Sequence, residues 1–80
     1  KVTQEWADRL NQIAKAFDEK AEVHDVRISE RSDTDKQLDF MMTVPFCNQT
    51  TEADVRKVMV ACIRAINPNM YVHMRYMKTN

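Results

Sequence analysis

Two histidines and one aspartate are the side chains best suited to chemistry in this sequence of 80 residues. His24 lies in the alternating run Val-His-Asp-Val-Arg-Ile, and His73 lies in the run Tyr-Val-His-Met-Arg near the other end of the chain. Asp39 lies between them, in a third alternating run. Imidazole nitrogens and carboxylate oxygens are suitable ligands for divalent transition metals such as zinc, manganese and iron. The candidate metal ligands are therefore Asp39, His73 and His24, with water or a second chain completing the coordination.

The same residues also allow an explanation without a metal, because no two of the candidate ligands are close in sequence. In this alternative Asp39 pairs with Arg75 or Arg27. His73 is then an exposed strand residue, and His24 packs at the edge of a sheet. Both explanations stay open at the level of the sequence.

The hydrophobic pattern predicts five elements that must position these side chains. They are a helix over residues 3–20, a strand over 23–30, a strand over 38–46, a helix over 51–66 and a strand over 70–77. The order αββαβ predicts an α+β fold, an open-faced sandwich in which both helices pack on one face of a three-stranded sheet. The two strands joined by the polar segment 31–36 should form a hairpin.

Each predicted helix has an apolar stripe and a candidate N-cap. Thr3 is the candidate cap of the first helix, and Thr51 begins the outline of a capping box in the second, with Asp54 in place of the preferred Glu. The stripe of the first helix contains Trp6, Leu10, Ile13 and Phe17. The stripe of the second contains Val55, Val58, Met59, Cys62 and Ile66.

Strand alternation predicts which side chains face away from the helices. In the middle strand, Leu38, Phe40, Met42, Val44 and Phe46 form one apolar face. Asp39 should therefore lie on the uncovered face of the sheet, and the same argument places His73 there. The face of His24 is undecided, because a single β-bulge would reverse it.

Composition excludes several classes of function. Twelve basic and twelve acidic residues cancel, so there is no overall attraction to nucleic acid or to anionic lipid. No apolar run approaches the ~20 residues that cross a bilayer. The chain has no glycine, which disfavours phosphate-binding loops, and no nucleophile elbow or H-E-x-x-H motif, so we do not expect an enzyme. Cys47 and Cys62 do not form a disulfide framework.

The element order, the sequence His-Asp-Val-Arg at 24–27 and the sequence Tyr-Val-His-Met at 71–74 resemble the cytosolic C-terminal domain of cation diffusion facilitator transporters. The resemblance implies a ferredoxin-like, metallochaperone-like fold and a domain that dimerises and binds a divalent metal to regulate transport. His24 and His73 stand at family histidine positions. Asp39 stands near an aspartate ligand of magnetosome-associated members.

The sequence departs from the family pattern at three places. Arg75 stands where members often have an acidic residue two positions after the last histidine, the middle strand lacks the histidine of zinc exporters, and the hairpin turn lacks its usual glycine. These departures argue against a multinuclear zinc site. They leave a sparse, weakly binding site centred on Asp39 and His73.

The resemblance implies one regulatory domain over residues 1–80, on the cytoplasmic side of a membrane. Because the first residue is Lys1, we expect the chain to be part of a longer protein, with a transmembrane domain upstream. The expected partners are a second copy of the chain, in a homodimer, and that transmembrane domain, with no nucleic acid and no membrane insertion by this segment. The alternative is a metal-free protein–protein interaction or dimerisation module.

Overall fold

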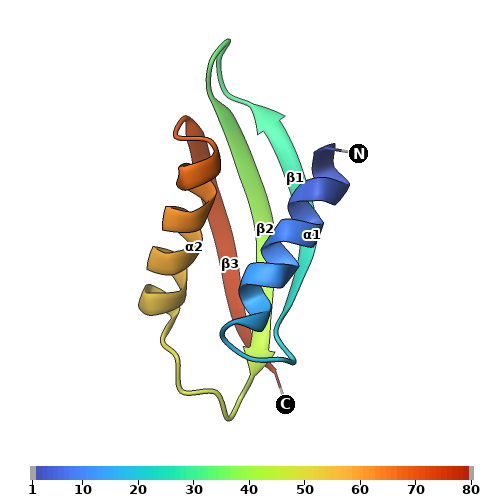
Figure 1. Ribbon diagram of the computed structural model, residues 1–80, viewed down its shortest axis with the longest axis vertical. Helices are drawn as coiled ribbons and strands as arrows, with labels where there is room; N and C mark the ends of the chain where they lie inside the picture. The colour runs from blue at the N-terminus through green and yellow to red at the C-terminus, as the bar shows by residue number, and fades with distance from the viewer. Residues whose placement is uncertain (1, 80) are drawn as a thin grey trace.

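The computed structural model describes residues 2–79 and contains the five predicted elements in the predicted order (Figure 1). They are α1 (Val2–Lys15), β1 (Glu22–Glu30), β2 (Lys36–Pro45), α2 (Glu52–Ile66) and β3 (Met70–Thr79). Both helices lie on the same side of one three-stranded sheet, with β2 in its centre. The predicted open-faced α+β sandwich is therefore confirmed.

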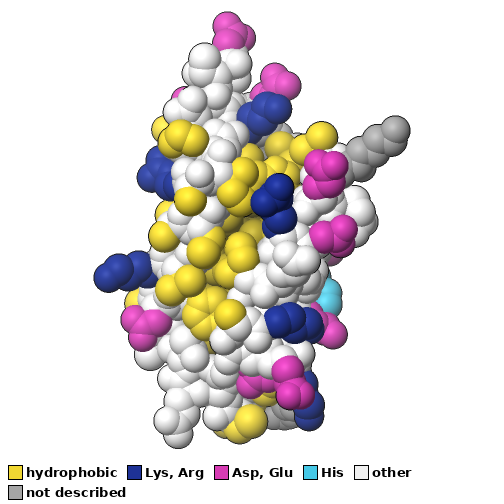
Figure 2. All heavy atoms as spheres, viewed as in Figure 1, with side chains coloured by type: hydrophobic (Ala, Val, Ile, Leu, Met, Phe, Trp, Pro, Cys, Tyr) yellow, Lys and Arg dark blue, Asp and Glu magenta, His cyan; other side chains and the backbone are white. Residues whose placement is uncertain are grey.

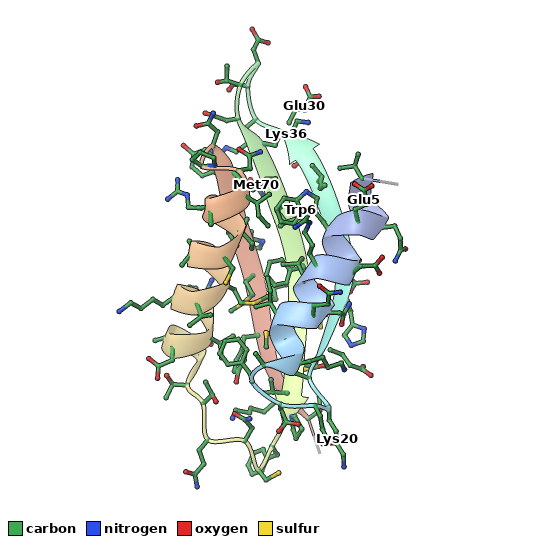
Figure 3. All side chains as sticks on the ribbon, in the orientation of Figure 1. Glu5, Trp6, Lys20, Glu30, Lys36 and Met70 are labelled. Carbon is green, nitrogen blue, oxygen red and sulfur yellow. The ribbon has the colours of Figure 1, made fainter. Side chains whose placement is uncertain are left out.

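The sheet is mixed, because the two connections to β2 differ. β1 and β2 form the expected antiparallel hairpin, whereas α2 carries the chain back across the sheet so that β3 runs parallel to β2. Lys36 and Met70, the first residues of β2 and β3, accordingly lie at the same end of the sheet (Figure 3). A parallel pair needs such a long crossover, and a helix usually provides it.

A β-bulge in β1 decides which of its side chains face the helices. His24 pairs with Met41 and Arg27 pairs with Asp39, so two residues of β1, Asp25 and Val26, oppose a single residue of β2. Asp25 has a positive φ of 56°, the only such value among residues 2–79. The extra residue places His24 and Arg27 on the same face of the sheet although they are three positions apart.

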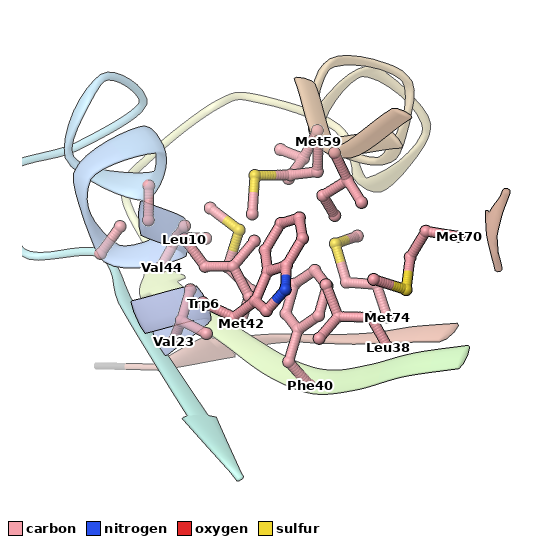
Figure 4. Packing of buried hydrophobic residues seen from close by; sticks show 14 residues of the cluster. Trp6, Leu10, Val23, Leu38, Phe40, Met42, Val44, Met59, Met70 and Met74 are labelled. Atoms are coloured by element: carbon pink, nitrogen blue, oxygen red, sulfur yellow. The ribbon is translucent and has the colours of Figure 1, made fainter. Parts of the chain in front are cut away.

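The core lies between the helices and the sheet. The side chains of Leu38, Phe40, Met42 and Val44 are all fully buried, as the alternation in β2 predicts. The prediction is wrong for Phe46, which follows the end of β2 at Pro45 and is exposed. Trp6 from α1 and Met59 from α2 enter the same cluster above β2 (Figure 4). The full set of buried apolar residues is Trp6, Leu10, Ala14, Ala21, Val23, Leu38, Phe40, Met42, Val44, Val55, Met59, Ile63, Met70 and Met74.

α1 is shorter than predicted at its C-terminal end, and its cap prediction is wrong. Thr3 lies inside the helix, which begins at Val2, and the helix ends at Lys15. The chain must turn there to enter β1 at Glu22, and the Asp18 side chain stabilises the turn by accepting a hydrogen bond from the backbone N–H of Lys20 at 2.9 Å. Phe17 still packs against the core, from the turn rather than from the helix.

α2 begins as predicted but buries a different stripe. The Thr51 hydroxyl accepts a hydrogen bond from the backbone N–H of Asp54 at 3.2 Å, which confirms the cap. The buried residues are Val55, Met59 and Ile63, at intervals of four, whereas Val58 and Ile66 are exposed. A helix on an open sheet buries only the residues directly above the strands, and here that stripe is narrow.

The face of the sheet opposite the helices carries no helix or strand from residues 2–79, and we call it the open face. Figure 2 views the helix layer, where apolar side chains reach the surface in a stripe between α1 and α2 and charged groups lie on both sides of it. The open face has a different composition. In its centre, Gln37, Asp39 and Met41 of β2 lie between their register partners on β1 and β3.

Candidate functional site

Asp39 and His73 are direct neighbours on the open face. The parallel register pairs Asp39 of β2 with His73 of β3, and Oδ1 of Asp39 lies 3.0 Å from Nδ1 of His73. The Asp39 side chain is 25% exposed and that of His73 is 64% exposed. The prediction that these two residues share the uncovered face is therefore confirmed. The Asp39 carboxylate is the more buried member of the pair, and the His73 imidazole is exposed to solvent.

The hydrogen bonds around Asp39 fix how the imidazole is presented. The Gln37 side-chain amide donates to Oδ1 of Asp39 at 2.9 Å, two positions along the same strand, so the carboxylate is held from two sides. An ionised carboxylate only accepts hydrogen bonds, so Nδ1 of His73 must be the donor. In the neutral imidazole the lone pair is then on Nε2, the ring nitrogen not bonded to Asp39. A metal-binding histidine commonly has this arrangement, with its second nitrogen bonded to a carboxylate.

The pair lies in a depression of about 490 Å³ on the open face. Its lining is polar and mostly charged, and consists of Asp25, Arg27, Gln37, Asp39, His73 and Arg75. The residues come from all three strands and from three successive rows of the open face, because the bulge in β1 lets both Asp25 and Arg27 line this depression. The depression is thus a product of the sheet register and not of a loop.

Two arginines flank the Asp39–His73 pair without pairing with Asp39. Arg27 is the register partner of Asp39 on β1, and Arg75 follows His73 by two positions on β3. The Arg75 guanidinium lies 4.0 Å from the carboxylate of Asp25, and both side chains are half exposed. Such an ion pair contributes at most about 1 kcal/mol to stability. The alternative pairing of Asp39 with Arg75 or Arg27 is wrong for this structure.

His24 lies on the open face but not at the pair. It is the register partner of Met41, and its Nε2 lies 3.1 Å from Oε1 of Glu22 and 3.5 Å from the hydroxyl of Thr43. His24 lines a separate depression at the other end of the sheet, with Glu22 and the exposed Cys47 among its neighbours. The structure therefore brings together Asp39 and His73 but does not bring His24 to them.

The pair is an incomplete metal site by itself. Within residues 2–79, no three histidine, cysteine, aspartate or glutamate side chains converge in an arrangement able to hold a metal ion. The residues present fit a divalent ion in part, through Nε2 of His73 with Asp39 behind it. Sequence reasoning missed Gln37, although its position two residues before Asp39 already places it on the same face of β2.

Comparison of the chain with protein-family models, with curated proteins and with solved structures gave no match. The relationship to cation diffusion facilitators stays a prediction drawn from the residues. Between residues 2 and 79, neither helix has the length and apolar character required to cross a bilayer.

Proposed function

We propose that this chain is a regulatory, dimerising domain of a divalent-cation transporter, which binds a zinc, manganese or iron ion weakly at the Asp39–His73 pair. The observation that carries the proposal is the 3.0 Å hydrogen bond between Asp39 Oδ1 and His73 Nδ1 on the open face. That bond orients the ring and leaves Nε2 with the free lone pair, as a ligand requires. The family resemblance of the segments at 24–27 and 71–74 adds the transporter context.

Regulation would act through a shift of population between two states of a dimer. A metal ion can favour a closed dimer only by binding it more tightly than the open one. One imidazole nitrogen, with Asp39 behind the ring, leaves most coordination positions of the ion unfilled, so a second copy that supplies further ligands would provide that difference in affinity. The few ligands in one chain also mean that affinity for the isolated domain is low.

Calorimetric titration with Zn²⁺ and with Mn²⁺ tests the metal site. We expect heat of binding for the wild type and none for His73→Ala, since that substitution removes the ligand nitrogen. His24→Ala is the matched control, because His24 lines a different depression, and it should retain the heat. Equal heats for wild type and His73→Ala would refute the site.

Dimerisation has a separate test in light scattering with and without Zn²⁺. We expect a mass of two chains at high protein concentration, and we expect Zn²⁺ to extend the dimer to lower protein concentration. His73→Ala should form the same dimer without that effect of Zn²⁺. A mass of one chain at every accessible protein and metal concentration would refute the dimer.

A second candidate function is a metal-free protein interaction module that uses the open face. The observation that favours it is the mixed charge of the depression, where Arg27 and Arg75 lie beside Asp25 and Asp39 and offer groups of both signs to a protein partner. Absence of any metal-dependent heat would leave this second function as the one supported.

A further inference from the structure

The two edges of the sheet differ in how their backbone groups are satisfied. β1 is one edge strand and β3 is the other. A side chain of α1 covers the edge of β1, because the Val23 N–H donates to Oδ1 of Asn11 at 2.9 Å and the Asn11 amide donates to the Val23 carbonyl at 3.4 Å. The bulge at Asp25 also interrupts the regular ladder of this strand. Both features prevent a further strand from pairing at an edge.

β3 has neither form of protection. All ten residues from Met70 to Thr79 are in continuous register with β2, without a bulge, and none of them is glycine or proline. Among residues 2–79, the backbone groups between Tyr71 and Lys78 hydrogen-bond only to β2. An edge strand presents a row of unpaired N–H and C=O groups on its outer side. β3 is therefore a long, regular edge that is ready to accept another strand.

A groove of about 230 Å³ lies beside this edge, between α2 and β3. It is lined by Val60 and Arg64 of α2 and by Met70, Tyr71 and Val72 of β3. No residue of α1, β1 or β2 lines it, and α2 lies beside β3 on the side away from β1 (Figure 1). A strand added to β3 would direct every second side chain towards the helix layer and into this groove. The mostly apolar lining favours apolar side chains at those positions.

The charges at this edge are positive. Arg64 is the only charged residue that lines the groove, and it forms no ion pair within 4.0 Å among residues 2–79. β3 itself contains a histidine, an arginine and a lysine but no aspartate or glutamate. The acidic residues of the open face, Asp25 and Asp39, belong to β1 and β2 and lie further from the edge than Arg75 does. A strand next to β3 therefore meets basic side chains first.

The strands of a second copy are poor occupants of this edge. β2 is central in its own sheet, and Asn11 together with the bulge blocks the edge of β1. A second β3 would place basic side chains opposite basic side chains, which is destabilising across paired strands. The partner that fits the edge is an acidic segment of another polypeptide.

We propose that the outer edge of β3 binds an extended peptide segment in which acidic residues alternate with apolar residues. The peptide adds a fourth strand to the sheet, and main-chain hydrogen bonds supply much of its affinity. Its apolar side chains enter the groove beside Val60, and its acidic side chains lie on the open-face side, next to Arg75. This inference goes beyond the proposed function and does not depend on a metal ion.

Hydrogen exchange measured by NMR tests the pairing, with an eight-residue peptide of alternating Glu and Val, blocked at both ends, as the probe. The outward amides of β3 should exchange about tenfold more slowly when the free peptide concentration is ten times Kd, since exchange then occurs only from the unbound fraction. The Val23 amide, which is already bonded to Asn11, should be unaffected. Absence of binding, or binding that leaves the β3 amides unprotected, would overturn the proposal.

The charge of the peptide has its own control. A peptide of alternating Lys and Val has the same length and the same strand period, and it should bind at least about fivefold more weakly because its charges repel those of the edge. Equal protection of the β3 amides by the two peptides would show that the edge does not select an acidic partner.

Charge reversal in the protein locates the bound peptide. Arg75→Glu and Arg64→Glu should each lower the affinity for the Glu–Val peptide by about fivefold, because each replaces an attraction by a repulsion. Arg27→Glu is the matched control, since Arg27 lies on the same open face but on β1, at the opposite edge of the sheet. Equal losses for Arg27→Glu and Arg75→Glu would contradict binding at β3.

Self-association gives a different result in the same experiment. If the outward amides of β3 became protected as the protein concentration rises, without any peptide, a second copy would be the occupant and the acidic-peptide proposal would be overturned. We expect their exchange rates to be independent of protein concentration.

Discussion

Asp39 Oδ1 and His73 Nδ1 lie 3.0 Å apart although the two residues are 34 positions apart in the chain. The parallel pairing of β2 with β3 creates this proximity, because it places the two residues directly beside each other on the open face. Asp39 is the less exposed of the two and is also held by Gln37. The carboxylate therefore orients the histidine.

The first prediction is that Asp39→Asn lowers the affinity for Zn²⁺ by about tenfold, the lower end of what loss of an orienting carboxylate costs a metal site. The amide keeps the size of the side chain but removes the negative charge behind the ring. Glu22→Gln is the matched control, because Glu22 is the carboxylate beside the other histidine, His24. Calorimetry on both variants checks this, and equal losses of affinity would contradict the role of Asp39.

The second prediction concerns the bulge that turns Arg27 to the open face. Asp25 has a φ of 56°, which a β-branched residue tolerates poorly and glycine tolerates freely. Asp25→Val should lower the free energy of unfolding by about 1–2 kcal/mol, whereas Asp25→Gly should change it by less than about 0.5 kcal/mol.

Urea unfolding measures both Asp25 variants. Ser29→Val is the control, since Ser29 lies in the regular part of β1 opposite Gln37 and valine suits an ordinary strand position. If Asp25→Val were as stable as the wild type, the left-handed conformation at this position would be wrong.

The third prediction tests the start of α2. Thr51→Ala should lower the free energy of unfolding by about 1 kcal/mol, because it removes the hydroxyl that accepts the hydrogen bond from the backbone N–H of Asp54. Thr51→Ser retains that acceptor and should restore most of the loss in the same urea titration. Equal losses for the two variants would show that the cap does not contribute.

The fourth prediction is a pH dependence that comes from Asp18 in the turn after α1. The backbone N–H of Lys20 and the Asn48 side chain both donate hydrogen bonds to its carboxylate, and they hold the Asp18 pKa below its ordinary value of 3.8. Because the Asp18 pKa is lower in the folded chain than in the unfolded chain, the ionised carboxylate stabilises the fold at pH values above 3.8. This contribution to stability is lost as the pH falls through the lowered pKa of the folded chain.

Unfolding by urea at a series of acidic pH values tests this contribution. Asp18→Asn should flatten the fall in stability below about pH 4. Asn48→Ala should flatten it only in part, since the hydrogen bond from Lys20 remains. If the free energy of unfolding of Asp18→Asn fell with acidic pH as steeply as that of the wild type, Asp18 would not be the source of this pH dependence.

The sequence predicted the part of the site that depends on strict alternation. Leu38, Phe40, Met42 and Val44 mark the helix-facing side of β2 so clearly that Asp39 must face the other way, and the same logic places His73. The face on which His24 lies could not be predicted, because the bulge at Asp25 shifts the register of β1. The local pattern of apolar residues gives no sign of this shift.

Contacts with other parts of the molecule explain the remaining differences. The sequence of α2 offers Val58 and Ile66 as core residues, but the sheet below accommodates only the line through Val55, Met59 and Ile63. Similarly, Asp18 and its partner Asn48 belong to two loops that lie 30 positions apart and meet only in the folded chain. Helical periodicity carries no information about either fact.

The most direct test of the central claim is the imidazole nitrogen NMR spectrum of His73 during a titration with Zn²⁺. The orientation by Asp39 predicts that the Nε2 resonance of His73 shifts strongly on metal binding, while Nδ1 remains protonated and bonded to the carboxylate. The resonances of His24 should shift less. A His73 spectrum that Zn²⁺ leaves unchanged, or a shift confined to His24, would contradict the claim that the Asp39–His73 pair is the metal site.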